Sequence, residues 1–164
     1  LSLGTTTLFV THDQEEAMAI SDRVGVMNEG VLVQIDTPDA LYNKPASSFV
    51  ASFVGTMNKI PAHINNGLVE IFGEKVIALK QGNESGKVLA LIRPEAIVAT
   101  PSTGTSNAKV LTRSFMGALS SIICQTNDGI IVQSLMKSAM TGELHPGSEI
   151  QLQILSKEVL VTNA

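Results

Sequence analysis

The spacing of apolar residues changes along the chain, close to Pro61. Before that point, short apolar runs alternate with helix start signals, whereas after it apolar and polar residues alternate in short segments separated by turns. The run Thr7–Val10 is rich in β-branched and aromatic residues and predicts a strand. A helix is predicted from about Gln14 to Ser21, with Ala17 and Ile20 facing inward. We therefore expect the N-terminal third to mix strands and helices.

The start of that helix carries several polar signals. Asp13 is a favourable N-cap, and Glu16 three residues later completes the pattern of a capping box. Glu15 and Glu16 place negative charge at the positive end of the helix dipole. His12 precedes the cap, so the prediction puts it at the C-terminal tip of a strand, where open α/β sheets bind ligands. An isolated histidine at such a turn is more commonly an ordinary polar residue.

A hairpin and two more helices are predicted before residue 56. Val24–Met27 and Val31–Ile35 are expected to pair across a turn that ends at Gly30, because glycine adopts positive φ freely. Thr37 as N-cap and Pro38 at the first helical position predict a second, short helix. A third helix, capped by Ser47 or Ser48 and closed by Gly55, is predicted from one apolar stripe: Phe49, Val50, Phe53 and Val54.

From Pro61 onward the pattern predicts an all-β region. The expected strands are 61–66, 67–72, 74–80, 87–92, 108–115, 119–126, 129–135, 149–155 and 158–162. Turns are expected at 65–67, 82–86, 127–129 and 145–147, and the polar stretch 100–107 is expected to be a loop between two halves. Many short strands with glycine-rich turns predict a sandwich or barrel.

Composition narrows the class of protein. The chain has 164 residues, of which 44% are hydrophobic and 16% charged, which is typical of a folded, β-rich protein. A net charge of −4, no basic block and few aromatic residues argue against nucleic-acid binding. No apolar run approaches the roughly 20 residues of a membrane span. We expect a soluble chain whose association with a membrane would run through a partner.

The remaining reactive side chains give weak signals. Cys124 lies in the apolar run Ile122-Ile123-Cys124, which predicts a buried, inert thiol. His63 and His145 have no Cys, Asp or Glu nearby at the spacing of metal ligands. No metal site is therefore predicted.

The segment LFVTHDQEEAMAISDRVGVMNEGVLVQIDTPDALY, residues 8–42, resembles the switch-histidine segment of ATP-binding-cassette (ABC) transporter ATPases. The resemblance continues through Asn43–Pro45 and Phe49–Gly55, and Leu91–Glu95 resembles the start of the second half of a TOBE (transport-associated OB) domain. This resemblance covers most of the chain. It implies an α/β remnant of a P-loop ATPase domain in about residues 1–57, followed by an all-β, OB-like barrel of the TOBE/MOP type in about residues 58–164.

For the site, the resemblance implies that His12 contacts the γ-phosphate of ATP and helps hold the attacking water and the catalytic carboxylate. The complete subunit would use ATP and magnesium. The phosphate loop Gly-x-x-x-x-Gly-Lys-Ser/Thr and the Leu-Ser-Gly-Gly signature are absent from this sequence, and it shows no acidic strand end before His12. We therefore interpret the chain as a C-terminal fragment of a longer ATPase subunit. By itself it is expected to hold no nucleotide or metal and to be inactive.

The resemblance also implies partners and a location. The parent would be the ATP-hydrolysing subunit of a bacterial-type ABC importer that energises solute uptake. It would form a homodimer with a second copy, contact membrane permease subunits and serve a solute-binding protein indirectly. Its location would be cytoplasmic, on the inner face of the cell membrane, with the TOBE barrel in a regulatory role. Phe53–Asn58 resembles the polyamine-type branch slightly more than the others.

One alternative belongs to a different class. The chain could be a stand-alone barrel that senses an oxyanion or another small molecule, with its N-terminal segment serving as a dimerisation arm. Related barrels in molybdate proteins bind oxyanions between subunits, but no cluster of Ser, Lys and backbone donors at a helix start is evident here. We interpret Arg93-Pro94-Glu95 as a structural turn, and Gly117 as a residue of a bulge or sharp bend.

Overall fold

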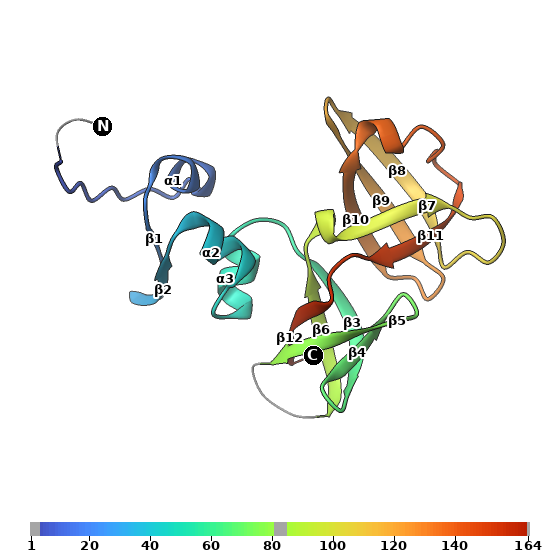
Figure 1. The fold of residues 1–164 in the computed structure, drawn as a ribbon, viewed down its shortest axis with the longest axis horizontal. Helices are drawn as coiled ribbons and strands as arrows, with labels where there is room; N and C mark the ends of the chain where they lie inside the picture. The colour runs from blue at the N-terminus through green and yellow to red at the C-terminus, as the bar shows by residue number, and fades with distance from the viewer. Residues whose placement is uncertain (1–3, 81–84, 164) are drawn as a thin grey trace. The chain divides into compact units, whose positions relative to one another are not determined.

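The structure, a computed structural model, describes residues 4–80 and 85–163. The chain forms two compact units, Leu1–Gly55 and Thr56–Ala164 (Figure 1). The turn predicted at 82–86 lies mostly outside the described residues. Within them, no helix is both long enough and apolar enough to cross a membrane.

The elements of the N-terminal unit follow its local signals. They are α1 (Gln14–Ile20), β1 (Val24–Asn28), β2 (Val31–Asp36), α2 (Pro38–Asn43) and α3 (Ser48–Phe53). The Thr37 hydroxyl accepts a hydrogen bond from the backbone N–H of Ala40 at 3.3 Å, and Ser47 does the same for Val50 at 3.2 Å. The predicted starts of the second and third helices are therefore confirmed.

The predicted hairpin is also confirmed. β1 and β2 pair antiparallel with Asn28 opposite Val31, which leaves a two-residue loop. Glu29 and Gly30 both have positive φ, 48° and 80°, as a type I′ turn requires. The twist of this turn matches that of the two strands, so a short sequence signal is enough to fix the pairing.

The core of the N-terminal unit is small. Its buried members are Val26, Leu41, Val50 and Val54, with Met18, Val24, Val33, Tyr42 and Phe49 packed partly against them. The predicted inward face of α1 is wrong at Ile20, whose side chain is 67% exposed. Because α1 has only seven residues, one narrow stripe can meet the core, and Met18 occupies it.

The strand predicted at Thr7–Val10 does not form. These residues have no regular secondary structure, and Leu8 and Val10 are 91% and 87% exposed. A strand needs a partner for its backbone groups, and no described strand pairs with this segment. The described part of the unit has one antiparallel two-stranded sheet and no parallel strands, so an α/β remnant is not seen.

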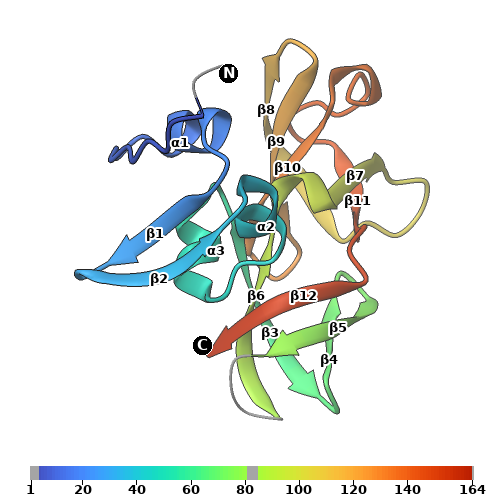
Figure 2. The same cartoon turned by 60° about the vertical axis from the view of Figure 1, so that its left-hand side comes forward.

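The barrel unit contains ten strands in its described residues. Five of them close a barrel in the order β12-β5-β4-β3-β6 (Figures 1 and 2). β12 lies parallel to β5 and antiparallel to β6, so the C-terminal strand closes the barrel. The bounds are β3 (Asn58–Asn65), β4 (Leu68–Ile71), β5 (Glu74–Lys80), β6 (Gly86–Ile92) and β12 (Glu158–Asn163).

The other five strands form a second sheet in the order β10-β9-β8-β11-β7. They are β7 (Ile97–Pro101), β8 (Ala108–Met116), β9 (Leu119–Thr126), β10 (Ile131–Lys137) and β11 (Glu149–Ile154). A short 3₁₀ turn, η1 (Pro94–Ala96), precedes β7, and a second, η2 (Ser138–Met140), follows β10. One continuous hydrophobic cluster spans both sheets, from Ile60 and Ile64 in the closed barrel to Ile122 and Leu152 in the second sheet.

The predicted all-β barrel is thus confirmed, with one strand missed. β7 occupies Ile97–Pro101, where a loop was predicted from residue 100. Gly117 has φ of 84° and sits in the two-residue connection between β8 and β9, which confirms the sharp bend. The bulge lies elsewhere, between Val110 and Thr112 of β8. Cys124 is fully buried in the core, as predicted.

Candidate functional site

His12, the predicted site residue, lies directly before α1 with its side chain exposed. Asp13 Oδ1 accepts a hydrogen bond from the backbone N–H of Glu16 at 3.0 Å, so the predicted N-cap is confirmed. In place of the second hydrogen bond of the predicted capping box, from Asp13 N–H to Glu16, the Thr11 hydroxyl links these two residues. Thr11 Oγ1 accepts from the backbone N–H of Asp13 at 3.0 Å and donates to Glu16 Oε2 at 3.3 Å. The two neighbours of His12 in sequence, Thr11 and Asp13, are therefore both hydrogen-bonded to the start of α1.

The surroundings of His12 are acidic. Asp13, Glu15 and Glu16 are exposed and lie within four residues of it, in the cap and first turn of α1. Carboxylates at this place stabilise the helix dipole but repel a phosphate. The residues around His12 therefore do not by themselves fit a nucleotide with its magnesium. The site offers one imidazole on a fixed backbone, which can act only together with groups from elsewhere.

The Arg-Pro-Glu motif forms η1, at the point where the chain passes from β6 to β7. Pro94 is buried, and Arg93 Nη1 donates to the carbonyl of Thr56 at 3.3 Å, which holds the first residue of the barrel unit. Arg113, on β8, makes a comparable contact: its Nη1 donates to the carbonyls of Thr141 and Gly142. Both arginines act on backbone carbonyls, in agreement with a structural role.

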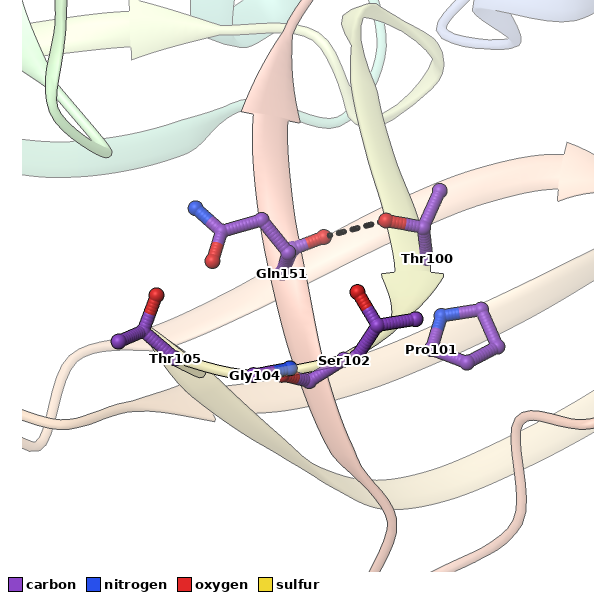
Figure 3. A pocket seen from close by; sticks show the side chains of 7 residues that line it. Thr100, Pro101, Ser102, Gly104, Thr105 and Gln151 are labelled. Carbon is purple, nitrogen blue, oxygen red and sulfur yellow. Dashed lines mark hydrogen bonds between the residues drawn. The ribbon is translucent and has the colours of Figure 1, made fainter.

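A shallow depression of about 400 Å³ lies beside the end of β7 (Figure 3). Its lining residues are all uncharged: Thr100, Pro101, Ser102, Thr103, Gly104, Thr105 and Gln151. Some of their polar groups are already used, since Thr100 Oγ1 donates to the carbonyl of Gln151 at 3.4 Å and Gly104 N donates to Ser102 Oγ at 3.3 Å. Sequence reasoning missed this depression, although its run of hydroxyl residues was visible.

The other candidate residues stay apart. His63 lies on β3 and His145 in the turn before β11, and both are exposed. Across residues 4–80 and 85–163, no three His, Cys, Asp or Glu gather as they would around a metal ion. Burial raises the pKa of the Cys124 thiol from its usual 9.0 to about 11, which keeps it protonated and unreactive at neutral pH.

The chain is similar to known proteins along most of its length. Residues 90–161 match the TOBE domain family. The chain is 31% identical over 165 residues to the Fe(3+) ions import ATP-binding protein FbpC of Fusobacterium nucleatum, a match covering 98% of this chain and 44% of that protein. It is 37% identical over 161 residues to the Sulfate/thiosulfate import ATP-binding protein CysA 2 of Chromobacterium violaceum, covering 93% and 44% of the two chains.

A third relative is named for a different solute. The Spermidine/putrescine import ATP-binding protein PotA of Mycoplasma mycoides is 37% identical over 130 residues, covering 76% of this chain and 37% of the relative. The chain thus spans about half the length, or less, of the curated relatives it matches.

Among solved structures, the cytoplasmic molybdate-binding protein ModG with molybdate bound superposes with a TM-score of 0.51. The identity is 16%, and the match covers 65% of this chain and 96% of ModG, so it concerns the fold alone. It supports a TOBE/MOP-like arrangement of strands. Residues 90–161 thus match the TOBE domain family, and most of the chain is similar to the ATP-binding proteins of importers.

Proposed function

We propose that this chain is the C-terminal part of the ATP-hydrolysing subunit of an ABC importer. Residues 1–57 would be the tail of the ATPase domain, and residues 58–164 a regulatory barrel. The observation that carries the proposal is the similarity to import ATP-binding proteins, which reaches 98% of this chain. The three relatives are named for the import of Fe(3+) ions, of sulfate or thiosulfate, and of spermidine or putrescine. The similarity therefore does not indicate which solute is transported.

In the complete subunit, His12 would contact the γ-phosphate of ATP. The exposed imidazole and its anchored neighbours support this role, because a phosphate sensor must be both accessible and fixed in position. Phosphoryl transfer depends on positioning and charge stabilisation by several groups. Because the first turn of α1 is acidic and this sequence contains no phosphate loop, the phosphate loop and the magnesium would come from the remainder of the subunit.

The same proposal specifies partners and location. The subunit would work as a homodimer, on the inner face of the cell membrane, bound to permease subunits and supplied indirectly by a solute-binding protein. ATP binding would close the two ATPase domains and drive alternating access in the permease. The exposed apolar side chains of the N-terminal unit support a surface that is covered in the complete assembly.

Steady-state ATP hydrolysis by the complete subunit tests the proposal. His12→Ala should lower the turnover rate at least about 100-fold and change the KM for ATP less than about threefold, because a γ-phosphate contact acts mostly in the transition state. His145→Ala, an exposed histidine in a barrel turn, is the matched control and should behave as the unmodified protein. Near-normal turnover of the His12→Ala variant would remove His12 from the mechanism.

The second candidate function is a ligand-sensing barrel, favoured by the depression beside β7. Its lining fits a neutral polar molecule better than an oxyanion, since none of the lining side chains carries a positive charge. Titration of the chain with a neutral sugar, and with molybdate and sulfate for comparison, followed at the Thr103 and Gln151 amides by NMR, tests this candidate. Saturable shifts at micromolar concentrations of any of these ligands would favour the sensor, and no shift with all three would count against it.

A further inference from the structure

The second sheet of the barrel unit does not close through backbone pairing. Its strand order leaves β10 and β7 as the two edges. Side chains nevertheless join these edges. Ser134 Oγ on β10 donates to the carbonyl of Ile97 on β7 at 2.5 Å, and the backbone N–H of Ala99 on β7 donates to Met136 Sδ on β10 at 3.4 Å. We call this line of contacts the β10–β7 seam.

A seam of this kind is weaker than a strand ladder. A ladder supplies a repeating set of backbone hydrogen bonds, whereas the two hydrogen bonds described across this seam each involve one side chain, and one acceptor is a thioether sulfur. The flanking side chains are well buried, since Ser134 is fully buried and Met136 nearly so. The seam is therefore closed to water but held by few bonds.

A further contact reaches the edge of β10 from the closed barrel. Asn58, the first residue of β3, donates from Nδ2 to the carbonyl of Gln133 at 2.8 Å. The backbone N–H of Gln133 donates back to Asn58 Oδ1 at 2.7 Å. The same Nδ2 also donates to the carbonyl of Ile92 at 3.2 Å, so both donors and the acceptor of the amide are used. At Gln133, the Asn58 side chain takes the place of a neighbouring strand.

A second asparagine makes the same bridge in a different setting. Asn107 Nδ2 donates to the carbonyl of Leu152 at 3.0 Å, and the N–H of Leu152 donates to Asn107 Oδ1 at 2.7 Å. Asn107 immediately precedes β8, and β8 already pairs with β11 through Ala108 and Ile150. The Asn107 bridge thus extends an existing ladder within one sheet, whereas the Asn58 bridge joins two sheets at an edge.

The position of Asn58 in the chain adds to this contrast. The barrel unit begins at Thr56, whose carbonyl accepts from Arg93 Nη1, and Asn58 follows two residues later. A displacement of the segment entering the unit reaches Asn58 before any other residue of β3. The segment is therefore connected directly to the edge of β10.

We propose that the β10–β7 seam is where the barrel unit opens, and that Asn58 is the latch that couples the entering segment to it. Release of Asn58 frees the backbone of Gln133, and the Ser134 and Met136 contacts then open with it, while the β8–β9 ladder stays formed. The device lies within the barrel unit and does not depend on the proposed ATPase function, so its failure would leave that function untouched.

Native-state hydrogen exchange of the 164-residue chain, measured by NMR, tests the proposal. Asn58→Ala should accelerate exchange of the Gln133 and Ala99 amides about 10- to 100-fold, with the Leu152 amide and the β8–β9 amides unchanged. Asn107→Ala is the matched control, because it removes a bridge of the same kind that lies within one sheet. It should accelerate exchange of the Leu152 amide and leave the Gln133 amide unchanged.

Two results of this comparison would overturn the proposal. Acceleration at Gln133 without Ala99 would mean that one bond was lost but no seam opened. Equal acceleration of all amides would mean that the whole unit was destabilised. Exchange in the unmodified chain at low denaturant concentrations gives a test that needs no variant. The Gln133 and Ala99 amides should share one opening reaction, distinct from the global unfolding that exposes the Cys124 amide; exchange of all three only through global unfolding would also overturn the latch.

Discussion

The two units of this chain bury their apolar residues to very different degrees. In the barrel unit, one cluster runs through both sheets and includes fully buried Ile122, Ile150 and Leu152. In the N-terminal unit the cluster of buried residues has four members. Large side chains of that unit remain more than half exposed: Leu8, Phe9, Val10, Ile20, Met27, Val31 and Leu32.

This difference in burial shows which elements form from local sequence signals and which need tertiary packing. The caps of α1, α2 and α3 and the type I′ turn of the hairpin are local, and they form in the N-terminal unit without a large core. Isolated helices and hairpins of this size are only marginally stable in water. We infer that the barrel unit contains its own stabilising core, whereas the N-terminal unit depends on apolar contacts from outside itself.

The largest expected effect concerns those outside contacts. We predict that the segment 1–57 is ordered by packing on a second copy of the chain, through strand pairing or exchange across a two-fold axis. Each large side chain that becomes buried contributes about 1.5–3 kcal/mol. Replacing Leu8 and Val10 together with Asp should therefore convert a dimer into a monomer, as measured by light scattering during size exclusion at micromolar concentration.

The matched control is Leu155→Asp, which changes an exposed leucine of the barrel unit and should leave the dimer intact. A monomeric unmodified chain whose 1–57 segment resists protease would contradict the prediction. It would show that the N-terminal unit needs no second copy.

The same contrast explains what could be predicted from the sequence. Barrel strands were recognisable because their alternation reflects a core inside this chain, and glycine turns such as Gly117 mark their ends. β7 was missed because its last residues, Thr100 and Pro101, share the polar composition of the following loop. The bridges of Asn58 and Asn107 could not be predicted, because an asparagine in a polar stretch indicates a turn equally well.

The strand predicted at Thr7–Val10 was wrong for a different reason. Thr7–Val10 has the composition of a buried strand, yet the structure leaves it without strand pairing and with Leu8 and Val10 exposed. A strand pattern indicates the kind of neighbours for which a segment is suited, and no strand within residues 4–80 and 85–163 pairs with this one. The cap around Asp13 was predictable, because all its groups lie within six residues. The role of His12 follows only from the resemblance and stays a prediction.

The second effect in size tests the core of the barrel unit. Ile122→Ala removes a fully buried side chain and should lower the free energy of unfolding by about 2–5 kcal/mol. Leu32→Ala removes an apolar side chain that is more than half exposed in the N-terminal unit, and should change it by less than about 0.5 kcal/mol. Urea denaturation measures both. Similar losses for the two variants would mean that the units do not differ in burial as proposed.

The third effect is a pH dependence confined to the barrel unit. The Cys124 thiol has its pKa raised from 9.0 to about 11, so the folded state favours the neutral form. This contribution is complete below about pH 9 and is lost as the pH rises from 9 to 11, by at most about 3 kcal/mol at about 1.4 kcal/mol per pH unit. Cys124→Ala should lose less stability over that interval in the same urea experiment. Parallel alkaline losses with and without the thiol would contradict the assignment.

The smallest effect isolates the N-terminal unit. Asp13 caps α1 by accepting from the Glu16 amide at 3.0 Å, and Asp13→Ala should cost about 1 kcal/mol of local stability, which is about fivefold faster exchange of that amide. Asp13→Asn keeps an acceptor and should lose only a few tenths of a kcal/mol, from weaker interaction with the helix dipole. Asp22→Ala, an exposed position just beyond α1, is the control for charge. Exchange of the Cys124 amide in the barrel should be identical in all three variants. If the Asp13→Ala change also accelerated exchange there, the two units would unfold together, and the contrast between a self-sufficient barrel and a dependent N-terminal unit would not hold.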